Sequence, residues 1–228
     1  MNTYKKDKTN QDILLSHDNQ QVMMEWEKPY MEQSIDKLKP TGDVLEIGFG
    51  LGYSATQIMK YKPKSYTVIE CDPNVIEYAK KWSTQYPDTP IYIIEGRWQE
   101  KLSSVGLFDS VYFDDFPLDI HKNSTKIDVL LSRKRLNIFI DICIQNHTKI
   151  GSRLSWYSSG NNGTVILSSD TMPFIRCETE KINISIPEHC TYRNNKDQNC
   201  TIIVIEKNRE YDFMFAQQYA LQQMKKYM

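Results

Sequence analysis

The segment from Val44 to Ser54 carries the first residues whose types and spacing could do chemistry. A short apolar stretch runs into three glycines at alternate positions, Gly48, Gly50 and Gly52. Glycines after a buried strand let a ligand approach the backbone closely at the carboxyl edge of a parallel sheet. Glu46 stands shortly before them, and a carboxylate there is awkward beside a pyrophosphate but suits a cationic ligand. A tight turn without a ligand is the alternative.

A second acid, Glu70, ends the next apolar stretch. A carboxylate at this point can accept hydrogen bonds from both hydroxyls of a ribose, as in nucleoside-binding folds. An exposed acid at a strand end is the ordinary alternative. Taken together, the glycine loop and Glu70 resemble class I S-adenosylmethionine-dependent methyltransferases. Glu46 and the G-x-G-x-G spacing favour a sulfonium ligand over a nicotinamide dinucleotide, and so disfavour a reductase.

Two further motifs follow the third and fourth expected strands. Trp98 follows the third, where an indole could cover the face of an adenine or be an ordinary core aromatic. Asp114 and Asp115 follow the fourth, at the edge of the sheet that faces the methyl-transfer position. We expect one of these acids to act in chemistry and the other to cap a helix or to be exposed.

The segment from Val22 to Met31 completes a set of motifs that occur in one order. Alone it reads as an amphipathic helix with Glu25 and Glu27 as surface charges. With the other motifs it resembles the guanidinoacetate N-methyltransferase family, whose relatives include the arginine δ-N-methyltransferases. The resemblance covers roughly Val22 to Tyr157. It is carried by Val22-Met23-Met24-Glu25-Trp26-Glu27-Lys28-Pro29-Tyr30-Met31, the glycine loop, Ile69-Glu70-Cys71, Gly96-Arg97-Trp98 and Phe113-Asp114-Asp115-Phe116-Pro117-Leu118, with a similar late segment at Pro187-Glu188-His189-Cys190-Thr191-Tyr192.

The resemblance implies an activity and a set of residue roles. The activity is S-adenosylmethionine-dependent N-methylation of the guanidino group of a small molecule such as guanidinoacetate. Glu27 and Asp114 match the family's carboxylates that bind this group, and they are the implied catalytic residues. Ser159 and Gly160 match the position that binds the acceptor's carboxylate. The implied cofactor-binding residues are Met23, Met31, Glu46, Gly48, Phe49, Gly50, Leu51, Gly52, Tyr53, Ser54, Glu70, Cys71, Trp98 and Asp114.

Two departures from the family pattern leave the acceptor open. The family has a longer N-terminal arm with a Trp that closes the site, whereas no Trp precedes Val22 here. The segment from Pro117 to Lys149 is longer than the family's and is basic at Ser132-Arg133-Lys134-Arg135. The alternatives are therefore arginine, free or protein-bound, another amine as acceptor, or a catalytically inactive protein that binds S-adenosylmethionine.

Paired carboxylates fit guanidino chemistry. A guanidinium stays protonated, and its delocalised lone pairs make it a poor nucleophile. Two carboxylates can orient its planar fork, hold the positive charge away from the attacking nitrogen and accept the released proton. Alignment of the reacting atoms then supplies much of the rate, with no need for a metal.

The elements that must position these residues alternate between strands and helices. The pattern predicts an α/β fold with a doubly wound, mostly parallel sheet and one antiparallel strand from Cys200 to Ile205. The resemblance implies seven strands and a Rossmann-like class I methyltransferase. The expected strands are 43–47, 65–70, 90–94, 110–113, 153–157, 178–186 and 200–205, and the expected helices are 22–38 with a kink or break at Pro29, 53–61, 73–86, 126–147 and 210–228.

The predicted organisation has three parts. An N-terminal arm and helix over 1–39 closes the site, the methyltransferase domain covers 40–209, and a C-terminal helix covers 210–228. Packing on the domain is the favoured role of that helix, and a dimer contact is the other, so an oligomer stays open.

Composition argues against two classes of partner, nucleic acids and membranes, and the resemblance implies a small-molecule guanidino or amine substrate. The net charge of −1 argues against a charge-driven nucleic-acid or membrane-surface binder. No apolar run approaches the roughly 20 residues of a transmembrane helix. The polar start, Met1 to Asn10, lacks the apolar core of a signal peptide, so a cytoplasmic location is expected. Five scattered cysteines with no Cys-x-x-Cys pair predict reduced thiols and no metal site.

Overall fold

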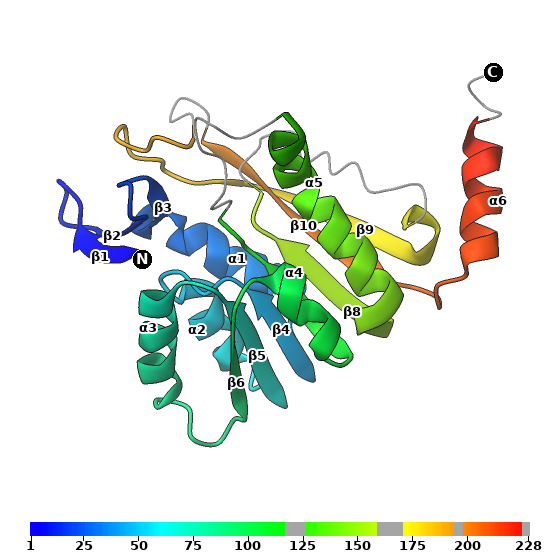
Figure 1. Ribbon diagram of the computed structural model, residues 1–228, viewed down its shortest axis with the longest axis horizontal. Coiled ribbons are helices and arrows are strands. Elements are labelled where there is room, and N and C mark those ends of the chain that lie inside the picture. The colour runs from blue at the N-terminus through cyan, green and yellow to red at the C-terminus, as the bar shows by residue number, and fades with distance from the viewer. Residues whose placement is uncertain (117–125, 159–170, 194–197, 225–228) are drawn as a thin grey trace.

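A computed structural model describes residues 1–116, 126–158, 171–193 and 198–224 (Figure 1). Its centre is one seven-stranded sheet in the order β6-β5-β4-β7-β8-β10-β9. Strand β10 runs antiparallel to both of its neighbours, and the paired strands from β6 to β8 are parallel. The strands are β4 (Asp43–Ile47), β5 (Ser65–Glu70), β6 (Ile91–Glu95), β7 (Phe108–Phe113), β8 (Thr148–Trp156), β9 (Ile175–Asn183) and β10 (Asn199–Lys207). The predicted fold class is confirmed.

The strand order reverses at β4, which lies between β5 and β7. Ligands of open α/β sheets bind at such a switch point, outside the carboxyl ends of the strands. Ile47 of β4 pairs with Phe113 of β7, so the residues that follow, Gly48 and Asp114, emerge side by side. The topology thus brings the glycine loop and the candidate catalytic acid to one edge.

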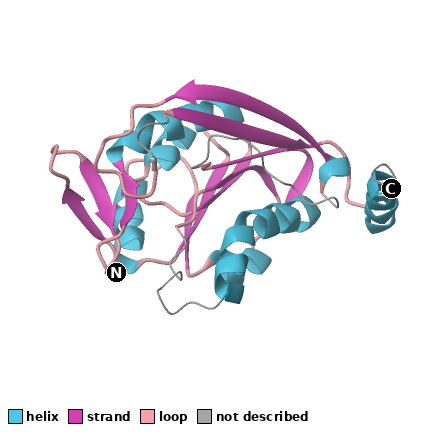
Figure 2. Ribbon diagram, turned by 90° about the horizontal axis from the view of Figure 1, so that it is seen from above, coloured by secondary structure: helices cyan, strands magenta, loops and turns pink. Residues whose placement is uncertain are grey.

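Two hydrophobic clusters cover the two faces of this sheet, and helices lie on both of its sides (Figure 2). Alternation along β4 sends Val44 to one face and Leu45 and Ile47 to the other. The first face packs on α1 (Lys28–Leu38), α2 (Tyr53–Lys60) and α3 (Pro73–Ser83). The second packs on α4 (Trp98–Lys101), the 3-10 turn η2 (Leu102–Ser104), α5 (Lys126–Ile142) and the π-helical turn η3 (Cys143–His147).

The N-terminal region differs from the predicted arm and helix. A separate antiparallel sheet is formed by β1 (Thr3–Lys6), β2 (Asp12–Leu15) and β3 (Gln21–Met24). The helix expected over 22–38 is wrong in its first part, because the chain from Gln21 to Met24 pairs with β2 and a 3-10 turn, η1 (Glu25–Glu27), precedes α1. Pro29 lies in the first turn of α1, where its missing N–H costs nothing, so it marks the start of the helix: of the two expected alternatives, the structure has the break and not the kink.

The C-terminal helix α6 (Phe213–Met224) stands at one end of the molecule in both views (Figures 1 and 2). Ala216 is buried and the Phe215 ring lies 5.9 Å from Phe174 of the turn η4 (Met172–Phe174). Phe213 and Leu221 are exposed. The helix therefore contacts the domain mainly through its first turns. In the part of the chain that the structure describes, no helix is both long and apolar enough to cross a membrane.

Candidate functional site

The glycine loop joins β4 to α2, and its backbone needs glycine for two reasons. Gly48, Gly50 and Gly52 have φ angles of 79°, 53° and 72°, in the left-handed region that other residues rarely adopt. A Cβ on Gly48 would also lie 2.1 Å from the carbonyl oxygen of Asp114. The loop backbone is therefore free of side chains where it passes β7.

Glu70 ties this loop to the start of α3. Its Oε2 accepts a hydrogen bond from the Phe49 amide at 2.9 Å, and its Oε1 accepts from the amides of Cys71 at 2.7 Å and Asp72 at 2.9 Å. Burial raises the pKa of Glu70, while these bonds oppose the rise by stabilising the carboxylate. A carboxylate has about four acceptor positions, so one that accepts three bonds can still take a ribose hydroxyl.

The first residues of the chain lie over the same loop. The Tyr4 hydroxyl donates to the carbonyl of Gly50 at 2.9 Å, and the Tyr4 ring lies 4.9 Å from that of Tyr78 on α3. The Asn2 amide donates to Asp72 Oδ2 at 2.7 Å. Asn2 and Tyr4 belong to none of the sequence motifs. The one indication in the sequence of their contact with the loop is a single Tyr in a polar, Lys-rich stretch.

Glu46 and Ser54 bond to each other inside the first core. Ser54 donates to one oxygen of Glu46, and the Tyr66 hydroxyl donates to the other. Burial raises the pKa of Glu46 to about 7. Both oxygens of Glu46 therefore already accept hydrogen bonds from hydroxyls of the protein. Direct contact of Glu46 and Ser54 with the cofactor stays a prediction.

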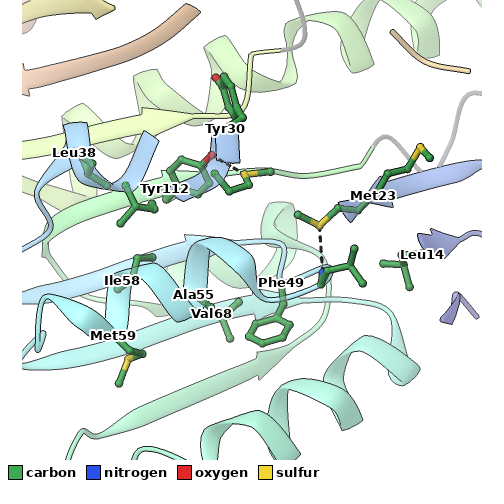
Figure 3. Close-up of a cluster of buried hydrophobic side chains, with 14 of the residues drawn as sticks. Leu14, Met23, Tyr30, Leu38, Phe49, Ala55, Ile58, Met59, Val68 and Tyr112 are labelled. Atoms are coloured by element: carbon green, nitrogen blue, oxygen red, sulfur yellow. Dashed lines mark hydrogen bonds between the residues drawn. The ribbon is translucent and has the colours of Figure 1, made fainter. Parts of the chain in front are cut away.

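Two methionines pack close to the loop and to β7 (Figure 3). The Leu51 amide donates to the sulfur of Met23 at 3.2 Å, drawn as a dashed line. The Tyr112 hydroxyl donates to the sulfur of Met31 at 3.1 Å. Phe49 turns toward α3, where its ring lies 5.2 Å from Trp82. Met23 therefore lies at the loop, whereas Met31 and the Phe49 ring are held by the core.

Glu27 and Asp114 lie far apart in the sequence, yet the charge of Glu27 acts on the pKa of Asp114. Glu27 is 3% exposed, and its Oε2 accepts from the Met24 amide at 2.8 Å. Burial raises its pKa to about 7. Burial also raises the pKa of Asp114 well above its ordinary value, and the charge of Glu27 is the next largest cause. The fold therefore brings the two acids near enough to interact, in a setting that disfavours two uncompensated negative charges.

Three residues around Glu27 have no predicted role. The hydroxyls of Tyr157 and Tyr192 and the charge of Arg193 all lower the pKa of Glu27 and so favour its charged form. Neither tyrosine hydroxyl has a partner at standard hydrogen-bond geometry. Tyr157 directly follows β8, and Tyr192 lies in the late segment that resembles the family, so the motifs included both tyrosines without indicating what they contact.

Asp115 has a different environment from Asp114. Its Oδ2 accepts from the indole N–H of Trp98 at 3.0 Å, and its Oδ1 pairs with Nε of Arg135 at 2.5 Å. Trp98 itself is buried, with its ring 5.8 Å from Phe113 and 5.3 Å from Phe139. Asp115 is thus partly buried and paired, unlike the exposed or capping acid that we expected. The role of Trp98 at the cofactor stays a prediction.

The remaining predicted residues divide into two groups. Tyr53 is half-buried at the start of α2, with the ammonium of Lys28 5.7 Å from its ring centroid, and Cys71 is half-buried beside Glu70. Ser159 and Gly160 lie outside the described residues. Across the described ranges no group of three or more His, Cys, Asp or Glu could hold a metal ion.

Residues 2–137 match the family model described as guanidinoacetate N-methyltransferase. This chain belongs to that family. The match begins at Asn2 and therefore includes β1, which carries Tyr4 over the glycine loop. It ends inside α5, so the late segment with Tyr192 lies beyond it.

Curated relatives of this family member carry the name protein arginine N-methyltransferase 2. The one from Candida glabrata is 36% identical over 122 residues, which are 48% of this chain and 29% of the relative. The one from Saccharomyces cerevisiae is 33% identical over 117 residues, which are 46% and 28%. The matched region thus spans less than a third of the length of these relatives.

Solved structures agree on the fold. The N-methyltransferase NodS from Bradyrhizobium japonicum WM9 has a TM-score of 0.56 at 15% identity, covering 81% of this chain and 97% of that one. Spermidine synthase from Thermotoga maritima has a TM-score of 0.57 at 15% identity, covering 94% and 74%. At such identities the likeness establishes the Rossmann-like methyltransferase fold alone.

Membership in the family makes S-adenosylmethionine the cofactor, as the sequence predicts. The described residues fit this ligand. The left-handed glycines leave loop backbone open to a nucleoside, and Glu70 ends β5 where a ribose diol is bound in such folds. The acids Glu27 and Asp114, whose pKa values are both raised, suit a positively charged ligand better than a pyrophosphate.

Proposed function

We propose that this chain is an S-adenosylmethionine-dependent N-methyltransferase whose acceptor is the guanidino group of a small molecule. The observation that carries the proposal is a pair of interacting acids, the buried Glu27 and the half-buried Asp114, of which Asp114 follows β7 at the sheet edge that also holds the glycine loop. Their raised pKa values mean that the free site lacks a positive charge which a guanidinium would supply.

The acids would bind and orient the acceptor. A guanidinium offers its N–H groups in a planar fork that two carboxylates can hold in one orientation. Its positive charge favours the ionised form of both acids, so binding would release protons that the free site retains. The Tyr157 and Tyr192 hydroxyls favour the charged form of Glu27 and would keep it an acceptor of hydrogen bonds.

Asp114 is the better placed of the two to receive the proton. It follows β7 directly beside Gly48, whereas Glu27 comes from η1. A carboxylate whose pKa is raised by burial is a stronger base than one in water. When bound, S-adenosylmethionine would supply the electrophilic methyl group.

Arginine is the second candidate acceptor, and one observation favours it. The curated relatives are named as arginine N-methyltransferases, although they match this chain over less than a third of their length. Free or protein-bound arginine presents the same guanidino group to Glu27 and Asp114. The two candidates therefore share the chemistry and differ only in what the acceptor carries beyond that group.

A labelled-methyl assay tests the proposal. The protein is incubated with methyl-labelled S-adenosylmethionine and, separately, guanidinoacetate, arginine, an arginine peptide and a lysine peptide, with mass detection of the products. We expect methylation of a guanidino compound and none of the lysine peptide. Methylation of the lysine peptide alone, or no product although S-adenosylhomocysteine binds, would contradict it.

A further inference from the structure

The guanidinium of Arg135 binds both the carboxylate and the main-chain carbonyl of Asp115, the residue next to the candidate catalytic acid Asp114. We call these two contacts the grip of Arg135. Arg135 on α5 places Nε 2.5 Å from Oδ1 of Asp115 and donates from Nη2 to the main-chain carbonyl of the same residue at 3.2 Å. The indole of Trp98 holds the other carboxylate oxygen at 3.0 Å. Both side-chain oxygens and the main-chain oxygen of Asp115 are therefore bound from α4 and α5.

The chain is fixed on the opposite side as well. The Asp114 amide donates to the carbonyl of Ile47 at 2.9 Å, and the Tyr157 amide donates to the carbonyl of Phe113 at 2.9 Å. The Cα of Gly48 approaches the carbonyl of Asp114 so closely that a Cβ would lie 2.1 Å away. The turn that carries Asp114 thus lies between the glycine loop on one side and the grip of Arg135 on the other.

The ion pair between Arg135 and Asp115 is partly shielded from water, so its charges can act on the neighbouring Asp114. The side chains of Arg135 and Asp115 are 29% and 14% exposed, so water screens their charges less than those of a surface pair. The planar guanidinium also fixes direction, which a lysine ammonium does not. Partial shielding and a fixed direction suit an interaction that holds Asp115 in one position.

The grip joins the motif that follows the fourth strand to the segment in which the chain departs from the family pattern. Asp115 directly follows Asp114 in that motif. Arg135 lies in the basic part of the segment that is longer than the family's. The two residues contact each other directly, and neither has another role in the proposed chemistry.

We propose that Arg135 is a positioning residue, which together with Trp98 holds Asp115 away from the acceptor and fixes the main chain that presents Asp114. This inference rests on the proposed function for the role of Asp114. A second acid left unpaired beside Asp114 could compete for the guanidino group and misalign it. With Arg135 and Trp98 in place, one carboxylate of the two remains to face the acceptor.

The electrostatics of the site give the proposal a signature. Among the charged groups that face Asp114, Glu27 from η1, Glu46 from β4 and the neighbouring Asp115 raise its pKa, and Arg135 from α5 lowers it. Removal of the Arg135 charge should therefore raise the pKa of Asp114, and removal of the Asp115 charge should lower it. Removal of both should bring the pKa back toward the parent value.

A charge cycle measured in two ways tests this. Arg135→Gln, Asp115→Asn and the double variant are compared by 13C NMR titration of the Asp114 carboxyl, assigned with Asp114→Asn, and by the pH dependence of kcat/KM. Lys134→Gln is the matched control, because it removes the same charge from an exposed neighbour on α5. We expect Arg135→Gln to move the Asp114 titration and the acid limb of activity to higher pH, and the control to move neither.

Arg135→Lys separates position from charge. It keeps the positive charge but loses the fork, so the titration should stay close to the parent while kcat falls on the order of tenfold, since small misplacements of reacting groups are costly. The KM for S-adenosylmethionine should not change. If Arg135→Gln does not fold, the kcat of Arg135→Lys still tests whether Arg135 is a positioning residue.

Two results would overturn the inference. One is an unchanged Asp114 titration in Arg135→Gln, with only a lower Tm, which would make Arg135 merely structural. The other is parent-like kcat in Arg135→Lys. The titration needs no acceptor, so it still tests the grip if the parent methylates no guanidino compound, and that outcome would count against the proposed function instead.

Discussion

The proposed cofactor side and the proposed acceptor side of the site are built in contrasting ways. On the cofactor side, Glu70 holds the amides of Phe49, Cys71 and Asp72, all on the loops that directly follow β4 and β5. On the acceptor side, Glu27 and Asp114 come from η1 and the end of β7, and their surroundings come from β8 and the segment before β10. One side is a local motif, and the other is assembled by tertiary structure.

The difference extends to how the acids are satisfied. Burial raises the pKa of both acids. Three backbone amides oppose the rise at Glu70, whereas Glu27 accepts one backbone amide and its pKa is raised to about 7. Burial with too few partners costs free energy in the folded state. The acceptor side therefore depends on a positively charged ligand in a way that the cofactor side does not, and each side should respond differently to the loss of a charge.

The largest expected effect separates the two sides by activity. Asp114→Asn keeps shape and hydrogen-bond reach but removes the charge and the base. Methyl transfer should fall by about a hundredfold or more, the usual worth of a general base. The affinity for S-adenosylhomocysteine, measured by calorimetry, should change little, because Asp114 acts on the reacting group.

Glu70→Gln is the matched change on the cofactor side. It should weaken S-adenosylhomocysteine by roughly 1.5–3 kcal/mol, the range for hydrogen bonds to charged groups. Its kcat at saturating S-adenosylmethionine should stay close to the parent value. If Asp114→Asn weakens the cofactor as much as Glu70→Gln does, the division into two sides is wrong. If Asp115→Asn shows the loss of activity instead, Asp115 is the working acid.

Sequence reasoning succeeded where the structure is local. The bounds of β4 and β5, Asp43–Ile47 and Ser65–Glu70, match the prediction because a short apolar run between turn signals specifies a buried strand. It failed over 22–27, where apolar spacing suggested a helix. Backbone pairing with β2 determined the outcome there, and helical spacing within one segment carries no information about such a partner.

The pairing of Glu27 with Asp114 on the proposed acceptor side was indicated only by the family resemblance. Nothing in the spacing of Glu27 and Asp114 indicates that they approach each other, since η1 and β7 meet through the fold of the intervening chain. Tyr157 and Tyr192 were out of reach for the same reason. The grip of Arg135 on Asp115 joins α5 to the end of β7, and no local pattern encodes it.

A smaller effect concerns stability and has a defined direction with pH. The pKa of Glu27 is raised from 4.5 to about 7, so between these values the folded protein keeps a proton that the unfolded chain releases. The contribution of Glu27 to stability is full below pH 4.5 and is lost as the pH rises through 7. Without acceptor, Glu27→Gln should therefore be more stable than the parent at pH 8, by at most roughly 3 kcal/mol at 1.36 kcal/mol per pKa unit.

Chemical denaturation at pH 5 and pH 8 measures this difference. The gain should be much smaller at pH 5, where Glu27 in the folded parent is protonated. Glu100→Gln removes an exposed carboxylate and controls for the change in net charge. A Glu27→Gln variant that loses stability at pH 8 would mean that the charged acid is already compensated in the free protein, and the contrast with Glu70 would disappear.

The smallest expected effect tests whether β1 belongs to the cofactor side. Tyr4→Phe removes the hydrogen bond to the Gly50 carbonyl and keeps the ring beside Tyr78. One neutral hydrogen bond contributes about 0.5–1.5 kcal/mol, so the affinity for S-adenosylhomocysteine should fall by roughly twofold to tenfold if β1 closes over the bound cofactor. Tyr92→Phe makes the same change on an exposed side chain of β6 and should leave the affinity at the parent value. An unchanged affinity in Tyr4→Phe, with a lower Tm, would mean that β1 stabilises the glycine loop and does not contribute to cofactor binding. A slower release of S-adenosylhomocysteine in the parent than in Tyr4→Phe would identify Tyr4 as a residue that helps to close the site over the bound cofactor.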